Sequence, residues 1–408
     1  MSNEILNGID YNSVRVLELS DFDSSKKTNY SEEKGSQRIV SLDFQRGLAI
    51  WLVTFLHSFE SLYDYTWVKE DPKALTSLPI PVLIIGAFVG FFSCWNAYFL
   101  LISSTVNSYS TTKKYSEKII RANKILAKQL LTGFLLIIVG MFTVSFGLKG
   151  YLDQGFRYGT WANFDILYRS QFRMSTLHII GYSLIINGLI HYLLMKKDGE
   201  NKYLRNMLVY GILTLAIIVA SPFVHSAVDN MSWKIPENPP PGLSDSTSWP
   251  NEYFQGYNAS AKAFFMTIIA GDMEPLFPYL ATSFIGSMIG LTLAKKEPVK
   301  RLPLIGGLIA IVFMVLGGMF MALGFFVPTN GRPAIGNYLL MLGGQIGVMM
   351  LFLYFVEYRG RTEKFANRKI VRHFRMWSMI SLTIFSFGML EIIPKEILSI
   401  VISYLFFP

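Results

Sequence analysis

The feature that most constrains this sequence is a series of long apolar stretches separated by short, basic segments. Most of the stretches have about 20 residues, the length that an α-helix needs to cross the hydrocarbon core of a bilayer. Hydrophobic residues make up 51% of the 408 residues and charged residues only 16%, which excludes an ordinary soluble protein of this length. Because backbone groups inside lipid need internal hydrogen bonds, the sequence predicts an all-α, polytopic membrane helical bundle.

We predict about ten transmembrane helices that follow a polar segment. Residues 1–38 contain no apolar run of spanning length, so we expect a cytoplasmic tail there and a transmembrane domain over residues 39–408. The predicted spans are 41–62, 80–107, 125–148, 176–196, 207–223, 264–294 with a break near Asp272, 303–326, 336–357, 376–393 and a short 396–407.

The distribution of Lys and Arg predicts the orientation of these spans. The tail and alternate connections carry 25 of these residues, whereas the opposite set of connections carries 10. Cytoplasmic connections retain positive charge, so both termini are expected on the cytoplasmic side of a cell or internal membrane.

Other classes of protein are excluded by charge pattern and cysteine content. The net charge of +9 is spread over short runs between apolar stretches, a pattern that indicates a lipid bilayer and no nucleic acid as partner. The single cysteine, Cys94, excludes a disulfide framework. No HxxxH, HExxH or paired aspartate motif is present, so no metal site is expected. A homo-oligomer is compatible with the sequence.

Ionisable residues inside a span are costly, so each is a functional candidate unless it lies near a helix end. The first span contains Asp43, Arg46, His57 and Glu60. On a helix, Arg46 lies about 60° from Asp43, and His57 returns to within about 20° of Arg46 after a rise of about 16 Å. The alternative is an interfacial Asp43–Arg46 pair with a histidine in the core. The shared stripe favours a functional role.

The sequence around this stripe resembles a known family. Arg38-Ile-Val-Ser-Leu-Asp43-Phe-Gln-Arg46-Gly-Leu-Ala, followed by His57, is similar to the first-helix signature of the transmembrane acyltransferase superfamily, with its heparan-alpha-glucosaminide N-acetyltransferase-like members. Three further stretches agree in order, and the resemblance covers most of residues 38–390. They are Thr176-Leu-His178-Ile-Ile-Gly181, Asp272-Met-Glu274-Pro-Leu-Phe-Pro278 and Trp377-Ser-Met-Ile-Ser381-Leu-Thr383.

The resemblance implies that residues 39–408 form an acyltransferase-like domain. The expected reaction moves an acyl group, in the first instance acetyl from acetyl-CoA, to a hydroxyl or amine of a sugar or lipid-linked glycan on the outer side. His57 is the candidate base or acyl carrier. Arg46 would bind the anionic donor, because a guanidinium suits phosphate geometry. Asp43 would orient Arg46.

Further residues are assigned to the two substrates on the same basis. We expect Lys113, Arg121 and Arg375 on the side where the acyl-CoA donor arrives, although basic residues there also serve as topology determinants near anionic lipid. The acceptor site is expected to contain residues that lie on the outer side or in the broken span, although His178 has an equally good structural interpretation. These residues are His178, Arg173, Asp272, Glu274 and Glu60.

A second class of function fits the same charges. A transporter or flippase for a lipid or small metabolite would use the buried ionisable residues to bind protons or substrate. A third interpretation is a non-catalytic membrane scaffold, in which His57 would be dispensable. Release of CoA from a labelled donor distinguishes the acyltransferase from the transporter and from the scaffold.

Overall fold

The computed structural model describes residues 38–62, 79–84, 95–119, 121–146, 174–196, 202–231, 260–271, 274–295, 299–324 and 332–381, with single positions between 151 and 171 and at 199 and 383. For residues 54–62 and 95–96 it describes the helical backbone alone. The chain divides into Met1–Gln37 and Arg38–Pro408, and every described residue lies in the second unit. The predicted tail therefore lies outside the described residues, apart from Arg38.

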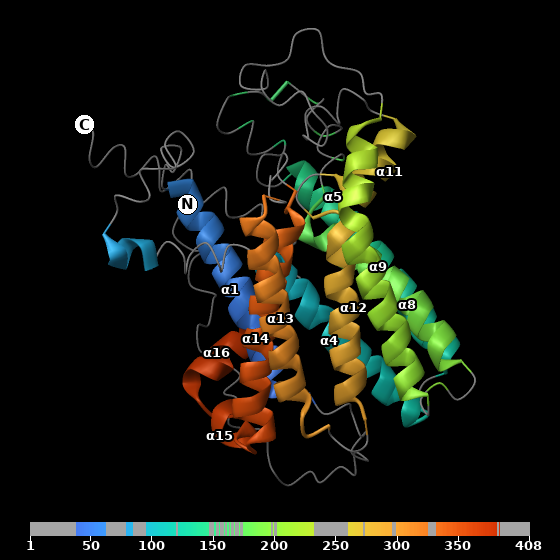
Figure 1. Cartoon of the computed structure of the whole chain (residues 1–408), viewed down its shortest axis with the longest axis vertical. Helices are drawn as coiled ribbons and strands as arrows, with labels where there is room; N and C mark the ends of the chain where they lie inside the picture. Colours follow the sequence, from blue (N-terminus) through green and yellow to red (C-terminus); the bar gives the residue numbers. More distant parts are fainter. Residues whose placement is uncertain are drawn as a thin grey trace, which may run out of the picture. The chain divides into compact units, whose positions relative to one another are not determined.

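The described residues form helices and turns, and none of them belongs to a strand (Figure 1). The helices are α1 (Val40–Leu62), α4 (Trp95–Ser116), α5 (Ala122–Phe146), α8 (Thr176–Met195), α9 (Tyr203–Asp229), α11 (Ala261–Ala270), α12 (Leu276–Leu293), α13 (Leu302–Ala322), α14 (Ile335–Phe352), the π-helical η5 (Leu353–Tyr358), α15 (Thr362–Ala366) and α16 (Lys369–Met379).

Six of these helices are long and apolar enough to cross a membrane: α5, α8, α9, α12, α13, and α14 together with η5. The prediction of an all-helical fold is confirmed. The six helices indicate a multi-pass integral membrane protein. They coincide with six of the predicted spans, and the break predicted near Asp272 is confirmed, because α11 ends at Ala270 and α12 begins at Leu276.

Several described helices differ from their predicted bounds. Helix α9 begins four residues before and ends six residues after the predicted span 207–223, and α13 ends at Ala322, four residues before the predicted end. Helices α4 and α16 differ further. The span predicted to end at residue 107 continues to Ser116. In this extension Thr111 donates its hydroxyl to the Asn107 carbonyl four residues earlier at 2.8 Å, so the hydroxyl is paired within the helix. The helix predicted to begin at 376 begins at Lys369, and its first residues are amphipathic. The rest of 376–393, the span 396–407 and residues 85–94 lie outside the described part.

The distribution of polarity across the helices is the inverse of that in a soluble protein. Leu304 and Leu308 on α13 expose 62% and 56% of their surface, while Thr282 and Ser283 on α12 are completely buried. Exposed apolar faces of this extent need a nonaqueous surrounding. The apolar outer face and the hydroxyl-bearing interior both fit insertion into lipid.

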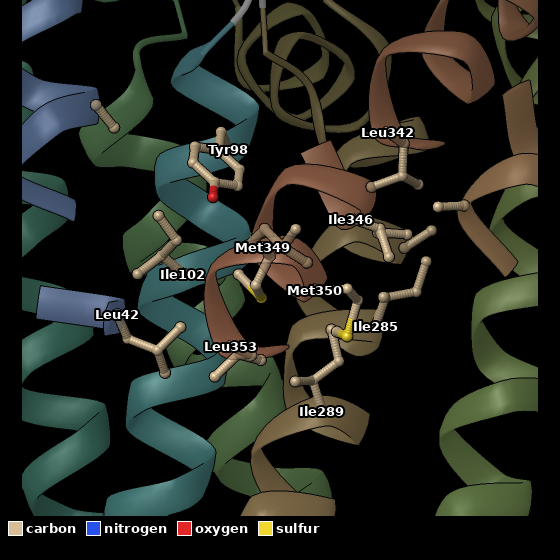
Figure 2. Close-up of a cluster of buried hydrophobic side chains, with 14 of the residues drawn as sticks. Leu42, Tyr98, Ile102, Ile285, Ile289, Leu342, Ile346, Met349, Met350 and Leu353 are labelled. Carbon is tan, nitrogen blue, oxygen red and sulfur yellow. The ribbon is translucent and has the colours of Figure 1, made fainter. Parts of the chain in front are cut away.

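Helix α12 occupies a central position, in contact with α4, α8 and α9. Its residues Ile285 and Ile289 pack in an apolar cluster with Leu42 of α1, Ile102 of α4 and Met350 of α14 (Figure 2). This cluster joins the amino-terminal helix to helices from the last third of the chain.

Small residues set the distance between neighbouring helices. A Cβ atom at Gly317 of α13 would lie 2.5 Å from the backbone nitrogen of Leu340 and 2.7 Å from the carbonyl oxygen of Gly336, both on α14. At Gly318, the next residue, a Cβ atom would meet nothing within 4 Å. Close backbone contact of this kind is a main source of helix association in lipid.

This pair of glycines gives a matched test of the packing. We expect Gly317→Ala to lower the free energy of unfolding by roughly 1–3 kcal/mol, because the added methyl group forces α13 and α14 apart. Gly318→Ala is expected to leave stability unchanged or to raise it, since alanine favours a helix. Unfolding in mixed micelles, followed by circular dichroism, measures both. Equal stabilities for the two variants would contradict the packing described here.

Candidate functional site

Arg46 lies near the amino-terminal end of α1, between a carboxylate and a hydroxyl group. Its Nε atom donates a hydrogen bond to Ser378 Oγ of α16 at 2.7 Å, and a terminal nitrogen lies 3.6 Å from Asp43 Oδ1. The predicted proximity of Asp43 and Arg46 is therefore present. The Arg46 side chain is 23% exposed, and a guanidinium has five donor hydrogens, so these contacts leave donors for a further anion.

The residue after Arg46 explains why Ser378 can reach it. A Cβ atom at Gly47 would lie 1.7 Å from the carbonyl oxygen of Phe374 in α16, so a side chain at this position is incompatible with the observed contact. The glycine allows the backbones of α1 and α16 to touch, and this contact brings Ser378 to Arg46. The short sequence Arg46-Gly47 thus supplies both the charge and the space beside it.

A buried polar group supports the same end of α1 from the other side. Tyr98 of α4 donates its hydroxyl to Gln45 Oε1, and Gln45 Nε2 donates to the Ser41 carbonyl at 3.0 Å. Glu357 of η5 accepts the Ser41 backbone N–H at 3.0 Å and the Thr362 hydroxyl at 2.8 Å. A carboxylate at a helix amino terminus is favourable, because it satisfies a free N–H group and the helix dipole.

The other residues that are predicted to bind the acyl-CoA donor lie in two parts of the structure. Arg375 is half-buried on α16, the helix that carries Ser378. Lys113 lies near the end of α4, where its Nζ atom is 3.4 Å from the Tyr109 hydroxyl, and Arg121 is exposed just before α5. Within the described residues, no hydrogen bond or ion pair joins Lys113, Arg121 or Arg375 to Arg46.

A second group of polar residues lies at the opposite end of the helices. Thr176, the first residue of α8, donates its hydroxyl to Glu274 Oε1 at 3.2 Å, in the break between α11 and α12. The continuous α14 and η5 have 24 residues, a length of about 35 Å. One end of this helix bonds α1 through Glu357, whereas Arg332, just before its other end, donates to the Ala270 carbonyl beside the break. Arg46 and Glu274 therefore lie at opposite ends of the bundle.

His178 has a structural role in the start of α8. The Ser175 backbone N–H donates to His178 Nδ1 at 3.2 Å, and the Ser175 hydroxyl lies 2.8 Å from the same atom. The ring is buried against Gly140 of α5. His178 is two residues after Thr176, which bonds Glu274, but the Nδ1 atom of its ring caps the start of α8.

The remaining predicted site residues are less completely described. Arg173 and Asp272 lie outside the described residues. His57 and Glu60 are on the helical backbone of α1, eleven and fourteen residues after Arg46, and their side chains lie outside the described part. Among the described residues, no group of three or more His, Cys, Asp or Glu side chains could hold a metal ion.

An ion pair between a buried arginine and a partly exposed aspartate at the Glu274 end was not identified from the sequence. The Arg332 side chain is 1% exposed, and its terminal nitrogen lies 2.6 Å from both carboxylate oxygens of Asp229 at the end of α9. The same side chain donates to the Ala270 carbonyl at 3.0 Å. In the sequence, Arg332 counted only toward loop charge. Its position as the single basic residue of a connection between two spans was the available signal.

Neutral polar residues also form a network in the interior. Asn187 of α8 donates to Ser283 of α12 and accepts a hydrogen bond from Ser287 at 3.1 Å. Ser283 lies 2.7 Å from the Ser104 hydroxyl of α4, and Ser108 donates to the Ser287 carbonyl at 3.1 Å. All side chains of this network are uncharged, so the ionisable residues of the sequence do not indicate it.

Comparison with protein-family models, with curated proteins and with solved structures finds no match for this chain.

The Arg332–Asp229 pair gives a second test. Arg332→Gln is expected to destabilise the protein by roughly 1–3 kcal/mol, because it removes the charge-assisted hydrogen bonds that the buried guanidinium donates to Asp229 and the hydrogen bond to the Ala270 carbonyl. Arg372→Gln, which changes an exposed arginine on α16, is the matched control and should change stability by less than about 0.5 kcal/mol. Both are measured by unfolding in mixed micelles. A loss of stability of the same size in both variants would count against a structural role for this ion pair.

Proposed function

We propose that this protein is a multi-pass membrane acyltransferase that moves an acyl group, acetyl in the first instance, from acyl-CoA to a hydroxyl or amine of a sugar or lipid-linked glycan. The observation that carries the proposal is the position of Arg46. A guanidinium with donors to spare lies near one end of the helix that carries His57 deeper along its axis. The resemblance of the surrounding sequence to the transmembrane acyltransferase superfamily supports the same reaction.

The proposed orientation places the donor and the acceptor on different sides. Lys and Arg are concentrated in alternate connections, which supports about ten spans with both termini on the cytoplasmic side. The Arg46 end would then face cytoplasmic acyl-CoA, while the end with Glu274 and Thr176 would face the acceptor. Arg375 would assist donor binding from α16, and Lys113 and Arg121 would attract the anionic donor from a neighbouring part of the same side.

The proposed chemistry needs a base and correct positioning, since a thioester is already activated. His57 removes the proton from the acceptor hydroxyl or amine, whose lone pair forms the new bond to the acyl carbon. The carbon–sulfur bond breaks, CoA leaves as a thiolate, and the imidazolium returns its proton to the sulfur. A transient acyl-histidine is the alternative path, and it would give ping-pong kinetics.

A transporter or flippase is the second candidate. The break between α11 and α12 and the buried Asn187–Ser283 network favour it, because interrupted helices and interior polar groups form substrate sites in transporters. The two functions are separated by incubating the purified full-length protein with labelled acetyl-CoA and a mixture of glucosamine-containing glycans. Release of CoA with labelling of a glycan supports acyl transfer, whereas glycan counterflow in vesicles without thioester cleavage supports transport.

We expect His57→Ala to lower turnover of acetyl-CoA at least ~100-fold, the usual contribution of a positioned general base. His373→Ala changes an exposed histidine on α16 and is the matched control, with turnover close to wild type. Free CoA is measured with a thiol reagent, and size-exclusion chromatography checks folding. Turnover of His57→Ala equal to that of the control would remove His57 from the mechanism.

We expect Arg46→Ala to raise the Michaelis constant for acetyl-CoA about tenfold and to change that for the glycan little, because of the two substrates the guanidinium is proposed to bind only the donor. Ser378→Ala keeps the charge but removes the partner that orients it, so an intermediate effect is expected. The two Michaelis constants are measured separately for each variant. An unchanged donor constant in Arg46→Ala would assign Arg46 to packing of α1 against α16.

A further inference from the structure

A groove lined by both cations and apolar residues lies where η5 is followed by α15. Its volume is about 650 Å³. The cations are Arg361, Lys364 and Arg368, and the apolar side includes Leu351, Phe355 and Phe365. The groove is separate from the contacts of Arg46, which does not line it.

The local sequence explains how the groove forms. Gly360 has a φ angle of +62°, a conformation that favours glycine, and it turns the chain from η5 into the short α15. Phe44 of α1 holds α15 in place, since its ring centroid lies 5.2 Å from that of Phe365 and 5.4 Å from that of Phe352. The groove is thus bounded by a fixed turn and by an aromatic contact with α1.

The cations of the groove are available to a ligand. Arg361, Lys364 and Arg368 are exposed, and within the described residues their side chains make no hydrogen bond or ion pair. The nearest carboxylate along η5, Glu357, already accepts hydrogen bonds from Ser41 and Thr362. Glu363 lies on the same segment but does not line the groove, so the three cations that line it attract an anion.

The apolar side of the groove belongs to the candidate membrane span. Leu351 and Phe355 expose 56% and 47% of their surface, and both lie in the 24-residue apolar helix that ends at Tyr358. Arg359 stacks over the Phe355 ring at 5.8 Å and over the Tyr354 ring at 5.1 Å, at the end of that helix. A ligand in the groove would therefore contact both hydrocarbon-facing residues and cations.

We propose that this groove binds one anionic phospholipid from the membrane leaflet at this end of the bundle. The phosphate lies among Arg361, Lys364 and Arg368, and an acyl chain follows Leu351 and Phe355. The charge complementarity selects an anionic headgroup, and the exposed apolar wall selects a ligand with acyl chains. This site goes beyond the proposed acyl transfer and does not depend on it.

The test uses the full-length protein in detergent micelles with dioleoyl-phosphatidylglycerol, dioleoyl-phosphatidylcholine or glycerol 3-phosphate, and native mass spectrometry counts the bound molecules. We expect one phosphatidylglycerol to bind about tenfold more tightly than phosphatidylcholine, with no displacement by millimolar glycerol 3-phosphate. Displacement by glycerol 3-phosphate would show that the groove takes a soluble anion and would overturn the proposal.

The variants locate the site. The triple change Arg361→Gln, Lys364→Gln and Arg368→Gln should weaken phosphatidylglycerol binding about tenfold. The matched control removes three exposed lysines elsewhere, Lys124→Gln, Lys128→Gln and Lys300→Gln, and should bind as wild type. Lys364→Glu alone gives the same direction of change if the triple variant does not fold. Wild-type binding in the groove variants, or an equal loss in the control, would overturn the assignment.

Discussion

Close contact between helix backbones is the constraint on which the rest of this structure depends. Lipid provides no hydrophobic driving force between apolar helices, so association relies on packing and on hydrogen bonds. A Cβ atom at Gly290 would lie 2.4 Å from the Thr105 carbonyl oxygen, and the same approach of α12 to α4 brings Ser283 within 2.7 Å of Ser104. The absence of a side chain at one position thus permits a polar contact at another. The hydroxyl-rich interior follows from the close packing.

The same principle builds the surroundings of Arg46. Glycine at position 47 removes the obstacle between α1 and α16, and the guanidinium then reaches a hydroxyl that is 332 residues away in the sequence. Among the described residues, Asp43 forms an ion pair with Arg46, so the arginine is partly neutralised but still has N–H donors for a further anion. A positive group that is oriented but not saturated is suited to an anionic substrate. This is the physical basis of the proposed donor site.

Local features of this chain were predictable from its sequence, whereas distant contacts were not. Apolar stretches of sufficient length identified α5, α8, α9, α12, α13 and α14, and the Asp43–Arg46 contact follows from a spacing of three on a helix. The Arg332–Asp229 pair joins residues 103 positions apart, and the helical periodicity of the sequence does not predict such a distant contact. The extension of α4 to Ser116 is rich in Ser and Thr, a composition that is also typical of loops, and Thr111 pairs its hydroxyl with a carbonyl of its own helix.

Helix α4 makes a polar contact with α1 near its beginning and with α8 near its end. Near its beginning, Tyr98 bonds Gln45 of α1, and near its end the Thr112 hydroxyl lies 3.4 Å from His191 Nε2 of α8. The two contacts are separated by about 20 Å along one rigid element. A displacement of α1 relative to α8 along the bundle would therefore break one of these two polar contacts. It would also disturb the apolar cluster that Ile50 of α1 shares with Ile179 of α8.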